Sequence, residues 1–103
     1  AHLPKILVSD GAVDAIARGA KLMAPGVVAF TEPFNKGDLV AVHTLKGELV
    51  ALMRTEVGSE ELKSMDRGVV ASPVRVVMKP GVYPSMWKKS KPGEASNSDQ
   101  TSG

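Results

Sequence analysis

The apolar runs of this chain are short, and most of them are bounded by glycine or proline. They cover residues 6–8, 27–30, 39–44, 48–53 and 68–78, and they are rich in β-branched side chains. Runs of this kind predict short β-strands, while Gly47 predicts a hairpin turn and Pro73 an interruption of the last strand. Two short helical patterns accompany them, too few for βαβ crossovers. The sequence therefore predicts a mixed, mainly β, compact barrel of about six short strands with one or two small helices.

The first helical pattern follows residues 6–8. Ser9 or Asp10 stands at the expected N-cap, and Asp14 and Arg18 form an i, i+4 pair of opposite charge. One apolar stripe is expected at helical spacing, formed by Val13, Ile16, Ala17 and Ala20. Residues 60–65 give the second, shorter helical pattern, with Ser59 as its expected N-cap.

Length and composition limit what the chain can be. Its 103 residues suffice for one small domain, and no apolar run approaches the roughly 18 residues that span a bilayer, so no membrane partner is expected. The absence of cysteine excludes disulfides, thiolate zinc sites and cysteine nucleophiles. The chain starts at Ala1 without an initiator Met, and we expect it to be part of a longer protein.

Residues 18–27 hold two glycines and a proline, which predict a tight loop with exposed backbone groups. Such a loop is suited to binding a ligand. Lys21 supplies a cation, and Leu22 and Met23 supply apolar surface for a flat group such as a base. The alternative is a helix C-cap at Gly19 followed by an ordinary turn into a strand.

Positive charge is concentrated towards the C-terminus. Residues 67–93 hold six basic and no acidic residues, whereas residues 1–66 hold seven basic and nine acidic ones. Because the basic stretch also contains Tyr83 and Trp87, it is suited to a polyanion with stackable bases, although a solvated face is the alternative. Arg75 either faces outward from its strand or pairs with an acid. His43 has almost no possible co-ligands, so it is expected to be structural or to face an edge, and no metal site is predicted.

Residues 91–103 are polar and rich in serine and glycine, and they cannot bury enough apolar surface to fold. We expect one domain over residues 1–90 and a disordered tail over 91–103.

The residues also resemble a known family, the PUA domains, named after pseudouridine synthases and archaeosine transglycosylases. The likeness runs from about residue 5 to residue 90 and is greatest to the PUA domain of H/ACA-guided, dyskerin-type pseudouridine synthases. The sequence departs from that pattern in two places: Met53 replaces a usual glycine, and Ser85 and Met86 replace a usually basic pair. The motifs that carry the resemblance are Gly19-Ala20-Lys21-Leu22-Met23-x-Pro25-Gly26-Val27, Gly37-Asp38, Thr44-x-Lys46-Gly47-Glu48, Asp66-x-Gly68-Val69-Val70-Ala71, Arg75-Val76-Val77-Met78 and Tyr83-Pro84-x-x-Trp87.

The resemblance implies a pseudobarrel of about six strands with a small helix packed over it. It also implies an RNA-binding face at the helix–loop corner and the last strand. The 3′ ACA of a guide RNA would contact Gly19, Ala20, Lys21, Leu22, Met23, Pro25 and Gly26. The adjoining lower stem would lie along Arg75, Lys79, Tyr83 and Trp87, with Lys88 adding positive charge.

The function that the resemblance implies is RNA binding without catalysis, in the service of a pseudouridine synthase whose catalytic domain lies elsewhere in the parent chain. No cofactor is expected. The location would be intracellular, and nucleolar if the parent is a eukaryotic dyskerin-type protein. Two alternatives stay open: a PUA domain of another RNA-modifying enzyme or translation-related factor that binds tRNA or rRNA, and a basic barrel that binds acidic proteins.

Overall fold

The computed structural model describes residues 2–81. The predicted site residues Tyr83, Trp87 and Lys88, and the predicted domain boundary at residue 90, lie outside the described residues.

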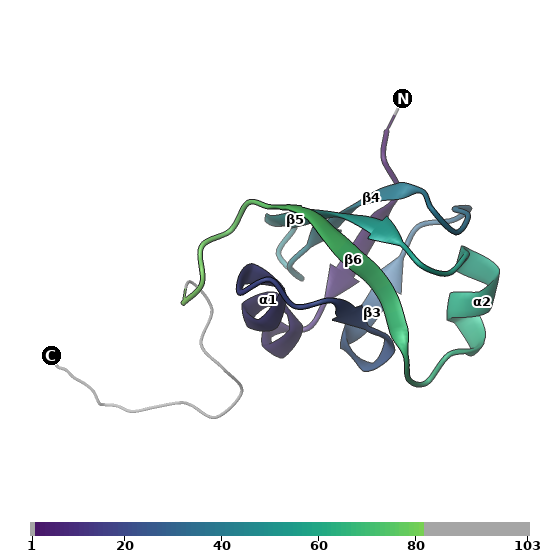
Figure 1. The fold of residues 1–103 in the computed structure, drawn as a ribbon, viewed down its shortest axis with the longest axis horizontal. Helices are drawn as coiled ribbons and strands as arrows, with labels where there is room; N and C mark the ends of the chain where they lie inside the picture. The colour runs from purple at the N-terminus through teal and green to yellow at the C-terminus, as the bar shows by residue number, and fades with distance from the viewer. Residues whose placement is uncertain (1, 82–103) are drawn as a thin grey trace, which may run out of the picture.

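One mixed sheet forms most of the molecule, with the strand order β2-β6-β5-β4-β1-β3. Its strands are antiparallel except for β1 and β4, which run parallel. Two helices and a 3₁₀ turn complete the described fold, which Figure 1 shows, and the prediction of a mainly β barrel with about six strands is confirmed. The elements are β1 (Lys5–Val8), α1 (Asp10–Ala17), β2 (Leu22–Met23), η1 (Ala24–Gly26), β3 (Val27–Phe30), β4 (Leu39–His43), β5 (Leu49–Thr55), α2 (Ser59–Ser64) and β6 (Val69–Val76).

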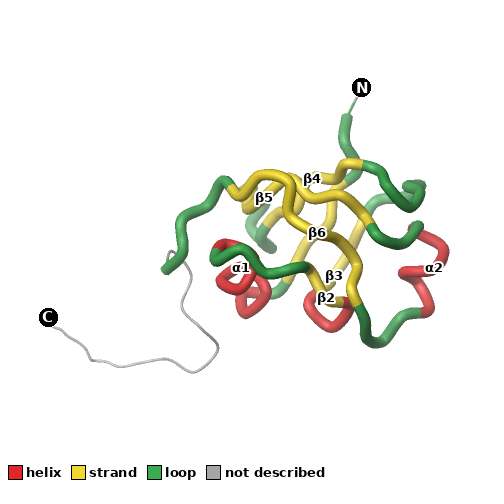
Figure 2. Tube along the Cα trace, viewed as in Figure 1, coloured by secondary structure: helices red, strands yellow, loops and turns green. Residues whose placement is uncertain are grey.

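The two edge strands of the sheet, β2 and β3, are consecutive in the chain. Only the three residues of η1 separate them, and Figure 2 shows this turn beside β2. Because a three-residue turn cannot span a wide gap, the two edges are brought towards each other and the sheet curls into a nearly closed barrel. The barrel therefore has its seam at η1.

Helix α1 covers the interior of the barrel. Ser9 is its N-cap, as predicted, and the Ser9 Oγ accepts a hydrogen bond from the Ala12 N–H. The buried residues of the helix are Val13, Ile16 and Ala17. Val13 and Ile16 pack in one apolar core with side chains from β1, β4, β5 and β6, among them Ile6, Val8, Val40, Val42, Val50, Met53 and Val70. Ala20, expected on the same stripe, lies beyond the helix end and is exposed.

The C-terminal end of α1 is a Schellman motif, and Gly19 is its left-handed residue with φ +99°. The Gly19 N–H donates to the Ile16 carbonyl at 2.8 Å, and the Ala20 N–H donates to the Ala15 carbonyl at 3.0 Å. These two bonds satisfy carbonyls that the helix end would leave without partners. The C-cap alternative for Gly19 is therefore confirmed, and the chain then enters β2 through Ala20 and Lys21.

Proline interrupts the last strand where the sequence predicts it. The pairing of β5 with β6 shifts register between Leu52 and Met53, and Pro73 stands opposite Met53 at that point. Since proline has no N–H to donate to a regular ladder, the irregularity accommodates it. Met53 is fully buried in the core.

Candidate nucleic-acid interface

A groove of about 320 Å³ runs between α1 and the segment that leads through β2 into η1. We call it the helix groove. Five predicted site residues line it, which are Lys21, Leu22, Met23, Pro25 and Gly26. The opposite wall comes from α1 and its N-cap, through Ser9, Gly11, Ala12, Ala15 and Ile16.

The groove depends on a close approach between α1 and η1. A Cβ atom on Gly26 would stand 2.8 Å from the Cβ of Ala12, so the two backbones meet at a distance that only glycine permits. The Ser9 N–H donates to the Gly26 carbonyl at 2.9 Å, and the Ala24 N–H donates to the Gly68 carbonyl at 2.9 Å. Both bonds fix η1 to its neighbours, so this wall of the groove is rigid.

The two side chains of β2 point in opposite directions, one towards solvent and one into the core. Met23 is 45% exposed and offers apolar surface, as predicted. Leu22 does not, because its side chain is only 1% exposed and packs in the core. The expectation that Leu22 presents a surface to a base is therefore wrong. Strand pairing with β6 turns it inward, and only its neighbours Lys21 and Met23 face outward.

Lys21 forms an ion pair with Glu56, whose Oε2 lies 3.8 Å from the Lys21 Nζ. The same carboxylate oxygen accepts a hydrogen bond from the Ser72 hydroxyl. Both partners of the ion pair are substantially exposed, so water screens it and it adds little to stability. Lys21 thus links the helix groove to the outer surface of β5 and β6.

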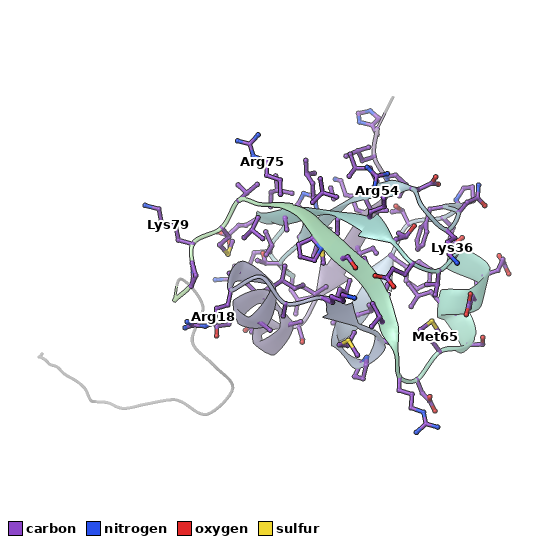
Figure 3. The ribbon with its side chains drawn as sticks, in the orientation of Figure 1. Arg18, Lys36, Arg54, Met65, Arg75 and Lys79 are labelled. Atoms are coloured by element: carbon purple, nitrogen blue, oxygen red, sulfur yellow. The ribbon has the colours of Figure 1, made fainter. Side chains whose placement is uncertain are left out.

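Arg75 lies apart from the groove. Its strand partner is Leu52, and it projects from the outer surface of the sheet, away from α1, as Figure 3 shows. Among residues 2–81 it forms no ion pair, so the outward-facing alternative holds. Met23 stands opposite Val69 at the start of β6. Arg75 lies further along β6, four residues beyond Ala71, which pairs with Leu22. The structure therefore places Arg75 outside the lining of the groove.

Lys79 lies in the segment that leaves β6 and returns towards α1. The Val77 and Met78 N–H groups donate to the Val50 carbonyl, and the Gly81 N–H donates to Asp14 Oδ1 at 3.4 Å. Asp14 also pairs with Arg18 at 3.0 Å, as predicted. Figure 3 shows Lys79 and Arg18 on the same side of the molecule. The described chain thus ends beside the C-terminal end of α1.

A second cavity, of about 380 Å³, opens on the outer side of β5 and β6. We call it the outer pocket, and it is lined by Lys36, Gly37, Arg54, Thr55, Glu56 and Ser72. None of these residues is in the predicted site. The sequence does indicate that two of these residues share one face of the sheet. Arg54 and Glu56 stand two positions apart at the end of an apolar strand, so their side chains point to the same side.

Neither a metal site nor a membrane span is found in the described part of the chain. Residues 2–81 contain no group of three or more His, Asp or Glu side chains close enough to hold a metal ion. No helix in that range is long and apolar enough to cross a bilayer. His43 lies on β4, which is flanked by β5 and β1, so the edge-facing alternative is wrong. Its Nδ1 is buried and has no hydrogen-bond partner among the described residues.

Known proteins that are similar to this chain include pseudouridine synthases. A chain of Pyrobaculum aerophilum, described as a probable tRNA pseudouridine synthase B, is 62% identical over 88 residues, which are 85% of this chain and 26% of the relative. Two solved structures are also similar. In a structure of an H/ACA RNP bound to a substrate RNA containing 2′-deoxyuridine, the matching chain is 39% identical with a TM-score of 0.80, covering 82% of this chain and 27% of that one. In a crystal structure of the archaeal box H/ACA sRNP Nop10–Cbf5 complex, the matching chain is 43% identical with a TM-score of 0.79. The match covers 84% of this chain and 28% of that one.

This chain thus spans about a quarter of the length of the relatives that it matches. Residues 4–77 match the model of the PUA domain family from β1 into the segment after β6, and that range is well over half of the chain. The chain therefore belongs to the PUA domain family.

Proposed function

We propose that this domain anchors a structured RNA, namely the lower stem and 3′ ACA of a guide RNA, for a pseudouridine synthase. Three observations support the proposal: membership of the PUA family, similarity to a chain in an RNA-bound H/ACA complex, and the helix groove. The groove is the observation that carries it, because it is formed by the same loop that the sequence singles out for ligand binding.

The chemistry of the groove is suited to unpaired nucleotides. Met23 and Pro25 supply apolar surface for a base, and Lys21 supplies a cation for a phosphate. RNA-binding proteins commonly read single-stranded segments by contacts to base faces and edges, and they use cations for the backbone. Leu22 contributes the buried floor of this site and not a contact surface.

Arg75 and Lys79 belong to the proposed stem contacts. Both are exposed, and Figure 3 shows both at the end of the molecule where the chain leaves β6. Arg75 projects from the outer surface of the sheet, whereas the segment that holds Lys79 returns to α1, which forms one wall of the helix groove. We expect Lys79 to contribute more to stem binding than Arg75.

Catalysis is assigned to the remainder of a longer parent protein. The relatives are about four times as long as the matched segment, so a catalytic domain has room outside it. This domain then acts by holding the RNA and needs no cofactor of its own. We propose an intracellular location for the parent. The nucleolar location expected for a eukaryotic parent gains no support from the Pyrobaculum relative or the Nop10–Cbf5 complex, which are archaeal.

A second candidate function follows from the name of the Pyrobaculum relative, which refers to tRNA. In that case the same groove would bind an unpaired 3′ end or loop of a tRNA. Binding of acidic proteins by a basic barrel is the third candidate.

The test is a titration of the domain, at low and moderate salt, with an RNA hairpin that ends in single-stranded ACA. The same hairpin with a scrambled tail and an unmodified tRNA serve as comparison ligands. The double variant Lys21→Ala, Met23→Ala removes the exposed cation and the exposed apolar side chain of the groove. We expect preference for the ACA tail in the unchanged domain and loss of that preference in the variant.

A matched control is available in the β4–β5 hairpin. Leu45 is 53% exposed, Lys46 is its exposed neighbour, and both lie away from the groove. The variant Leu45→Ala, Lys46→Ala should keep the preference for the ACA tail. Equal binding of both hairpins by the unchanged domain would overturn the guide-RNA proposal, and tighter binding of the tRNA would favour the second candidate.

A further inference from the structure

We propose that the outer pocket is a second nucleotide subsite, which holds one unpaired nucleotide whose base carries an exocyclic amino group. This inference rests on the RNA-binding function proposed above and extends it to a different surface. In the subsite, Arg54 and Lys36 would hold a phosphate, and Glu56 would accept a hydrogen bond from the amino group of cytosine or adenine.

The outer pocket adjoins the helix groove. The pairing of Leu22 with Ala71 places Lys21 next to Ser72 on the outer side of the sheet, and Ser72 stands opposite Arg54. Lys21 lines the groove, and its Nζ reaches Glu56, which lines the outer pocket. An RNA strand that leaves the groove past Lys21 therefore arrives at the outer pocket without crossing other elements.

Glu56 is held in a position to accept a hydrogen bond. Its Oε2 is occupied by the Ser72 hydroxyl and by Lys21, whereas its Oε1 has no partner among residues 2–81. A carboxylate can only accept, and a hydrogen bond to a charged acceptor is stronger than one between neutral groups. Since one oxygen is fixed, the position of the other is also restricted, and little ordering is needed when a donor arrives.

The cations of the pocket are available to an anion. One Nη atom of Arg54 donates to the Gly37 carbonyl at 2.9 Å, and its other N–H groups have no partner among the described residues. Lys36 is exposed and forms no ion pair in that range. Arginine offers five N–H donors in a planar fork that suits the oxygens of a phosphate.

The loop that forms one wall of the pocket is fixed in place. The Gly37 N–H donates to the Thr55 carbonyl at 2.8 Å, and the Thr55 hydroxyl donates to the Asn35 carbonyl at 2.8 Å. Thr55 is buried, so these bonds are shielded from water. The position of Lys36 along the rim of the pocket is thus set by the sheet, which preorganises the subsite.

The mixed charge of the pocket favours a nucleotide over an acidic protein segment. A carboxylate from an acidic partner would be attracted by Arg54 and Lys36 but repelled by Glu56, which lines the same pocket. A nucleotide carries an anion at one end and hydrogen-bond donors at the base edge, so it can satisfy both parts. Uracil presents a carbonyl oxygen where cytosine presents its amino group, and it would be disfavoured beside Glu56.

The experiment uses three probes, which are cytidine 5′-monophosphate, uridine 5′-monophosphate and inorganic phosphate. Each is titrated into the ¹⁵N-labelled chain while backbone amide and Arg54 Nε resonances are followed. We expect the cytidine nucleotide to shift the resonances of Gly37, Ser72 and Arg54 and to bind about fivefold more tightly than the uridine nucleotide, as loss of one base contact implies. Inorganic phosphate alone should give a weaker response at the same residues.

Variants separate the two parts of the subsite. Arg54→Ala should weaken both nucleotides by a similar factor. Glu56→Gln should bring the affinities for the two nucleotides close to each other. Removal of a negative charge alone would strengthen the binding of both nucleotides equally. The informative quantity is therefore the ratio of the affinity for the cytidine nucleotide to that for the uridine nucleotide. Two controls, Glu61→Gln and Lys46→Ala, change charge by the same amounts outside the pocket and should leave the ratio unchanged.

Equal binding of the two nucleotides by the unchanged chain, or a ratio that survives Glu56→Gln, would overturn the proposal. Shifts confined to the helix groove would do the same. The hairpin titration described above separates this result from the proposed function. Tail-dependent hairpin binding without a nucleotide response at Gly37 would reject the outer pocket alone, and the reverse result would reject the guide-RNA anchor alone.

Discussion

Gly26 and Ala12 lie in such close contact that a Cβ atom on Gly26 would stand 2.8 Å from the Ala12 Cβ. Since Ala12 belongs to the helix and Gly26 to the barrel seam, a side chain at position 26 must push α1 and η1 apart. We expect Gly26→Ala to lower the free energy of unfolding by about 1–3 kcal/mol, the usual range for overpacking. Urea-induced unfolding followed by circular dichroism measures this change.

The partner substitution provides the control for this contact. Ala12→Gly removes the Cβ atom that would clash and costs about 1 kcal/mol by itself, because glycine weakens a helix. In that background Gly26→Ala should cost clearly less than in the unchanged chain. An equal cost in both backgrounds would show that the contact between residues 12 and 26 is not the cause.

A different mechanism applies at Gly19, where no atom lies within 4 Å of a would-be Cβ but φ is +99°. Gly19→Ala should therefore destabilise through backbone strain alone, by roughly 1–2 kcal/mol. Gly19→Asn should cost less, because asparagine tolerates left-handed conformations. Thermal unfolding of the two variants gives the comparison, and an alanine variant as stable as the asparagine variant would contradict this account of the helix end.

The hydroxyl of Ser59 joins α2 to the loop before β4. Its Oγ accepts from the Phe34 N–H at 3.1 Å and donates to the Phe34 carbonyl at 3.2 Å, and both residues are buried. Ser59→Ala leaves that buried N–H without a partner, so we expect a loss of about 1–3 kcal/mol of stability. Ser64→Ala is the matched control on the same helix, since its exposed hydroxyl bonds only to the Glu61 carbonyl. Similar losses in the two variants, measured by urea unfolding, would contradict the role of Ser59.

Lys63 lies between two carboxylates, with Glu32 Oε1 at 2.9 Å and Glu60 Oε2 at 3.0 Å from its Nζ. Hydrogen bonds to Glu32 and then to Glu60 raise the pKa of Lys63 above its ordinary 10.5. A raised pKa means that the folded state holds the proton more tightly. The stabilisation that Lys63 gives the folded state through these carboxylates is therefore complete below pH 10.5. It is lost as the pH rises through the pKa that Lys63 has in the folded state.

We expect Lys63→Met to lower the melting temperature at neutral pH, and the difference from the unchanged chain to shrink in strongly alkaline solution. The effect should be small, because the group is exposed. Lys46→Met, which breaks no ion pair among residues 2–81, should show no such pH-dependent difference. A difference for Lys63→Met that stays constant across the titration would contradict this origin.

Local features of the fold could be predicted from the sequence because their causes are local. The N-cap at Ser9, the Asp14–Arg18 pair and the interruption at Pro73 each depend on residues a few positions apart. Five of the six strands in the described part of the chain also follow from short apolar runs. The turns within residues 18–27 were predicted for the same reason, since their glycines and proline stand close together.

Features that depend on distant residues could not be predicted in this way. The two-residue strand β2 is too short to give a pattern, and its pairing with β6 is what buries Leu22. The parallel pairing of β1 with β4 and the position of Arg75 outside the lining of the groove depend on how the strands pair. Ser59 has the sequence features of a helix N-cap, but Gly58 is the N-cap of α2. The Ser59 hydroxyl instead accepts a hydrogen bond from the Phe34 N–H, 25 residues away in the chain.

The seam of the barrel limits how such a domain can change its ligand during evolution. Residues Ala24–Gly26 both join the two sheet edges and form one wall of the helix groove. An insertion or deletion there would open the barrel along with the groove, so the length of this turn is not free to vary. Side chains that project beside it without entering the core, such as those of Lys21 and Met23, carry no such restriction. New binding preferences can therefore arise one side chain at a time, while the backbone that presents them stays the same.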